Sequence, residues 1–526
     1  MTTRTYSLAD LFEIVAAAIP EREAVVCGAR RLTYAHLNER ADRLAAHLQR
    51  RGIGAGDTVG LQLYNGTEYL EAFFAACKLR AVPLNINYRY VAQELRYLYG
   101  NAGLAALFYS APLAATVQPL RGDYPAIKVA LAPGAEYEAA LAAGPAYAVP
   151  RRSDDDLSLL YTGGTTGLPK GVMWPHRSLF FSALGGGGVY REGHAPIRAP
   201  EEIGEVAGAG PAMRFMAIAP LMHGAALWAS LISLFAGQTV ILRDQVDFNA
   251  GQIWDLVERE KANIVSVVGD AMAIPLADAL RAHPGRWDLS ALRVFGSGGG
   301  LFSTHAQQEL RRLLPDTLVL DSIGSSESGT LGSGSKPEDG AGFIKLAPRA
   351  DLRVVAPTHD RFVGPGEEGV VARVGNVAVG YWGDPKKSAE TFTTVEGLRV
   401  AITGDMARVL EDGSIVFLGR GSQCIDTGGE KVFPEEVEDV LHRHEAVADA
   451  VVVGISDPRW GNRVAAVVSL REGAQAGAEQ LKEFCRRYLA GYKVPKDIVF
   501  VGEVARSPAG KADYRWARAT VEGSLP

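Results

Sequence analysis

The chain has little cysteine for its 526 residues. The thiols are far apart, without the spacing of metal ligands, at Cys27, Cys77, Cys424 and Cys485. This pattern excludes a disulfide-rich secreted domain and a cysteine metal site, so we expect reduced thiols in a cytoplasmic protein. The N-terminus lacks the apolar core of a signal peptide, because Asp10 and Glu13 interrupt it.

The chain also lacks a strong charge of either sign. Its 54 basic and 60 acidic residues leave a net charge of −6 at pH 7. From this balance we expect no nucleic-acid partner. Hydrophobic residues make up 47% and charged residues 22% of the sequence, which is typical of a soluble globular protein with several structural units.

An uninterrupted hydrophobic run that could cross a bilayer is missing as well. Residues 215–242 carry no formal charge, but proline, histidine and glycine residues divide them into short pieces. We therefore expect a strand at 215–219, a core helix at 225–235 and a strand at 239–242 rather than a membrane span.

What is present in the first 345 residues is an alternation of helix and strand patterns. Apolar residues recur at helical spacing, as at Leu37, Ala41, Leu44 and Leu48, and short apolar runs separate such stretches. The alternation favours an α/β fold with a mostly parallel sheet. The expected helices are 34–51, 67–78, 271–282 and 304–314, and the expected strands are 58–63, 81–84, 264–268, 292–295 and 318–320.

Two glycine- or alanine-rich stretches interrupt this alternation. They are 185–188 and 130–148. Both are expected to form loops or turns, since glycine clusters mark such segments.

The character of the sequence changes twice after residue 345. Short strand patterns with glycine turns predict a β subdomain, and the stretch GRGSQCIDTGG at 419–429 predicts a joint. The expected elements beyond 345 are strands 352–355, 369–374, 406–410, 414–418, 448–454 and 463–470, and helices 434–443 and 478–489. We expect a large N-terminal domain of α/β sheets, 1–419, with the β subdomain at about 345–419. A small mobile C-terminal α+β domain follows at 420–526.

The segment 159–171, LLYTGGTTGLPKG, points to a polyphosphate. A short apolar run ends in a loop of three threonines, four glycines, one proline and Lys170. Glycines let backbone N–H groups approach phosphate oxygens, hydroxyls add donors and the lysine adds positive charge. In a P-loop a Gly-Lys-Ser/Thr sequence opens a helix, whereas Lys170 stands between Pro169 and Gly171. A plain glycine-rich turn is the alternative.

Five motifs occur in the order seen in adenylate-forming enzymes. They are TGGTTGLPKG at 162–171, DSIGSSESG at 321–329, ITGD at 402–405, GRGSQCIDTGGEKVFPEEVE at 419–438 and SPAGKADY at 507–514. On these motifs the chain resembles the adenylate-forming (AMP-binding) superfamily over nearly its whole length. The sequences PLMHGA at 220–225 and VVGDAM at 267–272 are similar to those of fatty acyl-CoA synthetases of the actinobacterial type, including enzymes for bulky lipid or steroid side-chain acids.

The resemblance implies an ATP-dependent acid–thiol ligase that uses Mg²⁺ and coenzyme A. A medium-chain, long-chain or bulky ring-bearing acid would form an acyl-AMP with release of pyrophosphate, and the acyl group would then pass to CoA. One alternative is an adenylate-forming enzyme of a specialised pathway, with a carrier-protein thiol or an amine as acceptor, or with nitrite as the acid. Another is a non-catalytic nucleotide-binding protein of the same fold. The expected partners are the acid, ATP and CoA, and a homodimer is a further expectation.

The same resemblance assigns the groups around the phosphates. The loop residues that would hold the β- and γ-phosphates are Thr162, Gly163, Gly164, Thr165, Thr166, Gly167 and Lys170. Ser326 and Glu327 would hold the α-phosphate and Mg²⁺, a hard cation that prefers carboxylate oxygens. Lys511 would bridge the attacking carboxylate and the α-phosphate as the adenylation lysine. The predicted catalytic residues are thus Lys170, Ser326, Glu327 and Lys511.

The resemblance also assigns the nucleoside contacts. Asp321 would accept a hydrogen bond from the adenine amino group, Asp405 would bind both ribose hydroxyls, and Arg420 would contact ribose or phosphate. Without the flanking motifs, Asp405 would be interpreted as a turn aspartate. The other residues predicted around the nucleotide are Gly298, Gly299, Gly300, Ser322, Ile323, Gly324 and Ser325. Ile323 stands where relatives often carry an aromatic residue that stacks on adenine.

For the second step the resemblance implies a rotation of the small domain. Lys511 would leave, and Gly428 and Gly429 would line the thiol tunnel, with the joint glycines accepting the change in φ and ψ. The usual hinge Asp or Lys is replaced here by Gln423. The residues predicted to line the acid pocket are His223, Trp228, Gly269 and Met272. A lone histidine such as His223 is otherwise more often a hydrogen-bonded core residue.

Overall fold

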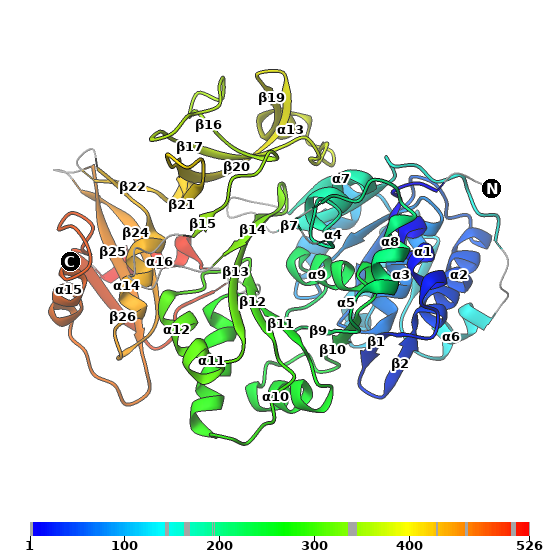
Figure 1. The fold of residues 1–526 in the computed structure, drawn as a ribbon, viewed down its shortest axis with the longest axis horizontal. Helices are drawn as coiled ribbons and strands as arrows, with labels where there is room; N and C mark the ends of the chain where they lie inside the picture. The colour runs from blue at the N-terminus through cyan, green and yellow to red at the C-terminus, as the bar shows by residue number, and fades with distance from the viewer. Residues whose placement is uncertain are drawn as a thin grey trace.

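The computed structural model describes most of the chain. The described residues are 4–142, 147–162, 169–191, 193, 195–334, 344–427, 430–457, 461–506 and 512–524. Four sheets organise them (Figure 1). No helix in these ranges combines the length and the apolar character that a bilayer crossing needs.

The eight-stranded sheet has the order β14–β13–β12–β11–β9–β10–β1–β2. Its strands are β1 (Glu23–Cys27), β2 (Arg30–Thr33), β9 (Arg214–Ala217), β10 (Thr239–Leu242), β11 (Ile264–Val267), β12 (Val294–Gly298), β13 (Leu318–Ser325) and β14 (Gly329–Gly334). All neighbours from β13 to β1 pair in parallel, and only the edge strands β14 and β2 run antiparallel. The predicted parallel α/β sheet is therefore confirmed.

The seven-stranded sheet has the order β18–β8–β7–β4–β3–β5–β6. Its strands are β3 (Thr58–Gln62), β4 (Val82–Asn85), β5 (Leu104–Tyr109), β6 (Val129–Leu131), β7 (Leu157–Thr162), β8 (Lys170–Pro175) and β18 (Gly380–Tyr381). Strands β3 to β7 pair in parallel, whereas β8 and β18 are antiparallel.

Helices cover both faces of these two sheets. The helices are α1 (Leu8–Ala18), α2 (Tyr34–Arg50), α3 (Thr67–Lys78), α4 (Ala92–Ala102), α5 (Ala114–Arg121), α6 (Ala135–Ala142), α7 (His176–Ala183), α8 (Glu202–Ala209), α9 (Gly224–Phe235), α10 (Ala250–Arg259), α11 (Asp270–Ala282) and α12 (Thr304–Leu313). The largest core lies between the sheets and includes Phe12, Leu44, Phe74 and Leu231. A second core joins α10–α12 to the outer face of the eight-stranded sheet, and a third joins α4 and α5 to the other sheet.

The β subdomain forms the third sheet, in the order β15–β21–β20–β17–β16, with β19 paired to β20. Its elements are β15 (Lys345–Leu346), β16 (Leu352–Val355), β17 (Glu368–Val374), α13 (Pro385–Thr391), β19 (Phe392–Val395), β20 (Leu398–Val409) and β21 (Ile415–Arg420). A single-turn 3-10 helix, Gly421–Gln423, follows β21 in the predicted joint.

The small C-terminal domain forms the fourth sheet, with its own cores. Its elements are β22 (Ile425–Thr427), β23 (Glu430–Val432), α14 (Pro434–His442), β24 (Val447–Asp457), β25 (Gly461–Leu470), α15 (Ala478–Arg486), β26 (Asp497–Val501) and α16 (Tyr514–Ser524). In Figure 1 this domain lies at the end of the molecule opposite the N-terminus. The exact bounds 1–419 and 420–526 stay predictions.

One local prediction is wrong. The stretch 130–148 was expected to be loop, but it contains the end of β6 and helix α6. Alanine is the strongest helix former, and the helix is held by burial of Tyr137, which is 0% exposed and whose hydroxyl donates to Glu71 at 2.8 Å. The turn at 185–188 is confirmed.

Candidate active site

The ends of the predicted phosphate loop are fixed by a strand pair. Thr162 ends β7, Lys170 begins β8, and the two residues lie opposite each other in the antiparallel register. The intervening predictions, Gly163, Gly164, Thr165, Thr166 and Gly167, lie outside the described residues. The ladder therefore holds both ends of this loop at one edge of the seven-stranded sheet.

Tyr381 contacts two of the predicted catalytic residues, Lys170 and Glu327. The Lys170 Nζ lies 5.4 Å from the ring centroid of Tyr381 and 3.4 Å from Oδ2 of Asp384. The Tyr381 hydroxyl donates a hydrogen bond to Oε1 of Glu327 at 3.0 Å. Lys170 and Glu327, which are 157 positions apart in the sequence, therefore meet through one side chain.

Tyr381 was missed by the sequence reasoning. It lies in β18, which pairs with β8, so the strand that begins at Lys170 also places the tyrosine. The available signal was the sequence Gly380-Tyr381-Trp382, an aromatic pair after a glycine in a short strand. Trp382 donates from its indole nitrogen to the carbonyl of Asn101 at 3.1 Å, which anchors the pair.

The turn between β13 and β14 carries Ser326 and Glu327. The Ser325 hydroxyl accepts from the backbone N–H of Glu327 at 3.3 Å and from that of Ser328 at 3.1 Å. The Trp174 indole N–H donates to the Ser326 carbonyl at 2.8 Å. These bonds fix the direction in which Glu327 leaves the turn.

The predicted glycine wall follows β12. Gly298 lies opposite Ser322 of β13, and a Cβ at Gly298 would lie 3.4 Å from the Ser322 carbonyl oxygen. Gly299 has a φ of +85°, a left-handed conformation that favours glycine, and a Cβ at Gly299 would lie 4.0 Å from the Cβ of Ala225. Gly300 packs against Val268 and Gly269. Small residues thus leave space between β12 and the start of α9.

The adenine motif lies along β13. Asp321 is 6% exposed, and the Ser322 hydroxyl is 2.8 Å from that of Ser333 on β14. Ile323 packs against the core of the β subdomain. Gly324 lies so close to the carbonyl of Gly329, 2.4 Å from an added Cβ, that no larger residue fits there.

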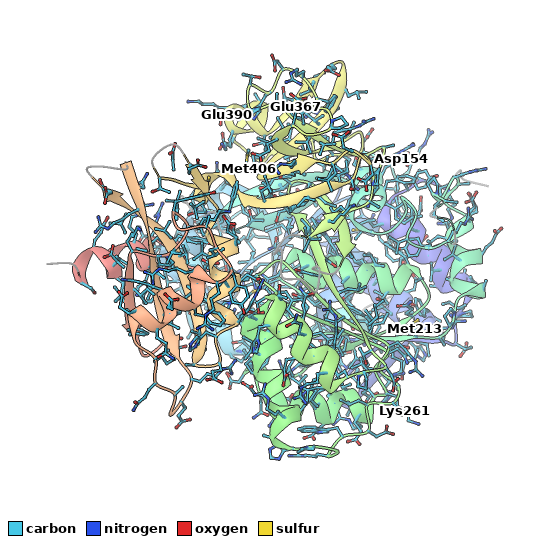
Figure 2. All side chains as sticks on the ribbon, turned by 60° about the vertical axis from the view of Figure 1, so that its left-hand side comes forward. Asp154, Met213, Lys261, Glu367, Glu390 and Met406 are labelled. Atoms are coloured by element: carbon cyan, nitrogen blue, oxygen red, sulfur yellow. The ribbon has the colours of Figure 1, made fainter. Side chains whose placement is uncertain are left out.

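The predicted ribose ligand Asp405 lies at the boundary of the β subdomain. It pairs in register with Arg420 of β21, whose side chain lies outside the described part, and its N–H donates to the Thr403 hydroxyl at 3.2 Å. Gly404, with a φ of +83°, turns the strand directly before it. Figure 2 shows the next residue, Met406, where the β subdomain meets the small domain.

The predicted acid-pocket residues gather around α9 and α11. Trp228 is buried in α9 and contacts Trp174 edge-on, with ring centroids 6.0 Å apart. His223 precedes α9, and its carbonyl accepts from the N–H of Leu227 at 3.0 Å. Gly269, with a φ of +58°, precedes α11.

Met272 opens onto a further cavity of about 90 Å³. Its other walls come from the segments that follow β3, β4, β9 and β10, and include Tyr64, Tyr88, Ile218 and Phe248. Of the four residues predicted to line the acid pocket, Met272 lines this cavity.

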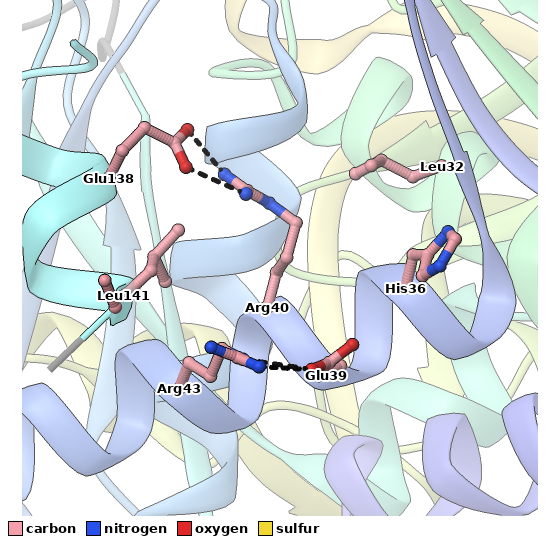
Figure 3. A pocket seen from close by; sticks show the side chains of 8 residues that line it. Leu32, His36, Glu39, Arg40, Arg43, Glu138 and Leu141 are labelled. Carbon is pink, nitrogen blue, oxygen red and sulfur yellow. Dashed lines mark hydrogen bonds and ion pairs between the residues drawn. The ribbon is translucent and has the colours of Figure 1, made fainter. Parts of the chain in front are cut away.

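A larger cavity, of about 340 Å³, lies elsewhere, between α2 and α6 (Figure 3). It contains none of the predicted site residues. Its charged side chains are paired, since Arg40 contacts Glu71 and Glu138, and Arg43 contacts Glu39. This cavity and the predicted site are therefore in different parts of the molecule. The predicted Gly428, Gly429 and Lys511 lie outside the described residues.

The sequence profile of the AMP-binding enzyme family matches residues 12–382, and that of the AMP-binding enzyme C-terminal domain matches 436–511. The chain is 43% identical to the medium/long-chain-fatty-acid–CoA/3-oxocholest-4-en-26-oate–CoA ligase of Mycobacterium tuberculosis (strain ATCC 25618 / H37Rv), covering 98% of this chain and 96% of that protein. It is 41% identical to the 3-oxocholest-4-en-26-oate–CoA ligase of Rhodococcus rhodochrous, covering 97% and 95%.

Solved structures agree with the fold. ATP-bound MatB from Rhodopseudomonas palustris superposes with a TM-score of 0.81 at 26% identity, covering 97% of this chain and 98% of that one. The anthranilate CoA ligase AuaEII in complex with anthranoyl-AMP has a TM-score of 0.84 at 23% identity, covering 99% and 98%.

Proposed function

Because this chain belongs to the AMP-binding enzyme family, we propose that it is an acyl-CoA ligase for medium-chain, long-chain or bulky ring-bearing acids. The acid carboxylate attacks the α-phosphorus of ATP, the bond to the bridging oxygen breaks, and pyrophosphate leaves. The CoA thiolate then attacks the acyl carbon, and AMP leaves with the electron pair of the broken bond. The observation that carries the proposal is the meeting of Lys170 and Glu327 through Tyr381.

The first step joins an anion to a polyanion, so it needs positive charge and donors at the phosphates. Lys170 supplies an ammonium group beside the loop, and the turn with Ser326 and Glu327 lies on the other side of Tyr381. Lys511 is proposed to bring the second positive charge, to the attacking carboxylate and the α-phosphate. These groups position reactants and stabilise charge and form no covalent bond to the substrate.

The carboxylate of Glu327 fits a magnesium ion. Tyr381 occupies one lone pair of Oε1, and the turn orients the rest of the carboxylate. Within the described residues no three His, Cys, Asp or Glu side chains are placed to hold a metal ion together, so the remaining ligands would be phosphate oxygens and water, which Mg²⁺ accepts readily. When bound, the ion neutralises phosphate charge.

The acid class rests on two observations. The glycine wall at 298–300 leaves space opposite Ala225, as a wide substrate requires. The relatives of 41–43% identity are named for fatty acids and a steroid side-chain acid.

We propose that residues 1–419 and 420–526 are the two parts that move relative to each other. A cytoplasmic location and a homodimer remain predictions.

ATP–pyrophosphate exchange across an acid panel tests this function. The panel contains acetate, octanoate, palmitate, ferulate and 3-oxocholest-4-en-26-oate, and mass spectrometry with CoA identifies the thioester. We expect exchange and thioester with octanoate, palmitate or the steroid acid, and little with acetate. A strict preference for acetate would contradict the acid class, and exchange without any CoA thioester would contradict the acceptor.

A further inference from the structure

The small domain contacts the large one through polar side chains of α14. Asp439, which is 0% exposed, accepts from the backbone N–H of Thr304 at 2.7 Å and lies 3.2 Å from its hydroxyl. One turn further along the helix, Nδ1 of His442 lies 3.5 Å from Oδ2 of Asp270. An outer ion pair joins Arg471 to Asp278 at 3.8 Å. Helix α14 of the small domain thus contacts the first residues of α11 and α12 in the large domain.

The Asp270–His442 contact is buried. Asp270 is 5% and His442 is 2% exposed, and neither Asp270 Oδ2 nor His442 Nδ1 makes a hydrogen bond within the described part of the chain, so each has the other as its ionic contact. Asp270 is itself held in place, because its Oδ1 accepts from the Ser303 N–H at 2.9 Å and its N–H donates to the Leu301 carbonyl at 2.7 Å. The carboxylate of Asp270, held in place in the large domain, therefore faces His442 of the small domain.

The contact continues into the small domain. His442 Nε2 lies 3.2 Å from Oδ1 of Asp449, and Asp449 receives two hydrogen bonds from the Arg506 guanidinium, at 2.6 and 2.5 Å. Arg506 pairs through its backbone with Ala512. These two residues enclose the segment in which Lys511 is predicted to act. A continuous set of polar contacts therefore leads from Asp270 to the base of that segment.

The charges agree with this connection. Although burial opposes it, the hydrogen bond to Asp449 and the charges of Asp270 and Asp449 raise the pKa of His442 above its ordinary value. Burial also works against the Arg506 charge, but Asp449, Glu438 and Asp270 raise the pKa of Arg506. The carboxylate of the large domain therefore acts on both cationic groups of the small domain.

The orientation of the small domain identifies the reaction step. Thr427 and Glu430, which enclose Gly428 and Gly429, lie at the end of the sheet where Thr427 pairs with Gly461. Glu430 and Gly461 are exposed, and Figure 1 shows β22 running toward the outer edge of the domain, away from α11 and α12. Arg506, by contrast, lies on the side that meets Asp270. The flank of the predicted Lys511 segment, rather than the exposed flank of Gly428 and Gly429, therefore faces Asp270.

We propose that His442 is a positioning residue for acyl-AMP formation, which links Asp270 of the large domain to the Asp449–Arg506 pair and so holds the small domain in its adenylation orientation. The inference rests on the proposed two-step reaction. Breaking the link should weaken the first half-reaction and spare the second, for which the small domain must leave this position.

Two variants from opposite sides of the interface test the link. His442→Gln keeps a group that can reach Asp449 and removes the one that faces Asp270, and Asp270→Asn keeps an oxygen for Ser303. We expect either variant to lower kcat for octanoate-dependent ATP–pyrophosphate exchange about tenfold, with the KM for ATP unchanged. Conversion of supplied octanoyl-adenylate and CoA to the thioester should stay within about twofold of wild type.

Arg471→Gln is the matched control, because it removes a partly exposed pair, Arg471–Asp278, at the same interface. We expect it to change neither half-reaction more than about twofold. Equal losses in both half-reactions of the His442 and Asp270 variants would indicate a structural role and overturn the proposal. Unchanged exchange would overturn it as well.

Hydrogen exchange at the domain interface does not depend on catalysis, so it tests this inference separately from the proposed function. The Thr304 N–H donates across the interface, so its hydrogen exchange in the full-length protein reports docking. We expect faster exchange of the Thr304 peptide in both variants and unchanged exchange in Arg471→Gln. If no acid supports pyrophosphate exchange in the wild type, the proposed function fails, and unchanged protection of Thr304 would independently overturn the link.

Discussion

Different kinds of side chain form the boundary between the two large sheets and the boundary between the large and small domains. Between the eight- and seven-stranded sheets lies a continuous apolar core with side chains from both. Between the large and small domains the side-chain contacts of Asp439, His442 and Arg471 are polar, and no hydrophobic core of the described residues combines side chains from both sides of the 421–423 turn.

The difference explains which boundary can move. Burial of apolar surface stabilises a fold in proportion to the area removed from water. Separating the two sheets would expose their whole shared core to water and would therefore cost much free energy. Polar contacts can be exchanged for water at a small net cost, which suits a domain that docks, leaves and docks elsewhere. The contrast fits the proposal that a large lobe with a fixed interior holds the nucleotide site and that the small lobe delivers groups to it.

The largest effect is expected from the group that the small domain delivers. Lys511→Ala removes the positive charge proposed to stabilise the transition state of acyl-AMP formation, so pyrophosphate exchange should fall roughly 10²–10⁴-fold. ATP binding by calorimetry should change little, because the large domain holds the triphosphate. The supplied acyl-adenylate should still be converted with CoA, and a normal exchange rate in this variant would refute the role.

Breaking the apolar boundary should instead cost stability. Leu231 of α9 is 0% exposed in the core between the sheets. Leu231→Ala should lower the free energy of unfolding by about 2–5 kcal/mol, as cavity-forming core substitutions do. Urea unfolding of the full chain measures it, and Arg471→Gln at the polar boundary should leave the same transition unchanged. A comparable loss in the control would contradict the distinction between the boundaries.

Much of this arrangement is predictable from the sequence where local pattern and burial agree. Helix α3 and strand β10 have the expected bounds, 67–78 and 239–242. Strand β13 runs to Ser325 instead of 320, because pairing with β12 and β14 extends it through polar residues. Such an extension depends on neighbours that are distant in sequence.

The site shows the same limit. The motifs predict Lys170 and Glu327, which the structure brings together, but they do not predict Tyr381, which connects them. The Asp270–His442 contact is equally hidden, because each residue is unremarkable in its own segment and acquires meaning only when the domains dock. Motifs identify groups that are proposed to touch the substrate, whereas supporting contacts depend on tertiary structure.

Tyr381→Phe tests a single polar contact inside the large domain, the hydrogen bond from Tyr381 to Glu327. The substitution keeps the ring beside the Lys170 ammonium and removes only the hydroxyl that donates to Glu327. Loss of a hydrogen bond to a charged group should reduce pyrophosphate exchange about tenfold and raise the Mg²⁺ concentration needed for half-maximal rate. Thermal stability should stay near wild type, and an unchanged magnesium dependence would contradict the proposed link to Glu327.

The polar boundary should also respond to pH. A histidine whose pKa is raised stabilises the docked state when protonated, so its contribution is full below its ordinary pKa near 6.5 and is lost as pH rises through the raised value. The ratio of wild-type to His442→Gln exchange rates should therefore fall toward one as the pH rises from the ordinary pKa of histidine through the raised pKa of His442. A constant ratio would contradict this. The charged groups that act on His442 or respond to it are Asp270, Asp449, Arg506, Glu438 and His305.

The smallest effect concerns the buried carboxyl behind this boundary. Burial, together with the charge of Glu435, raises the pKa of Glu438 to about 8, and its Oε1 accepts from the Val452 N–H at 2.9 Å. Because the folded protein holds this proton more tightly than the unfolded chain, the stability that it contributes is full below the ordinary pKa and is lost as pH rises toward 8. Glu438→Gln keeps the acceptor without the titration. Its stability relative to wild type should therefore rise by roughly 1–3 kcal/mol between about pH 5 and 8, measured by urea unfolding. A difference that stays the same at every pH would show that Glu438 does not take up a proton in the folded domain over this range, and would contradict the raised pKa.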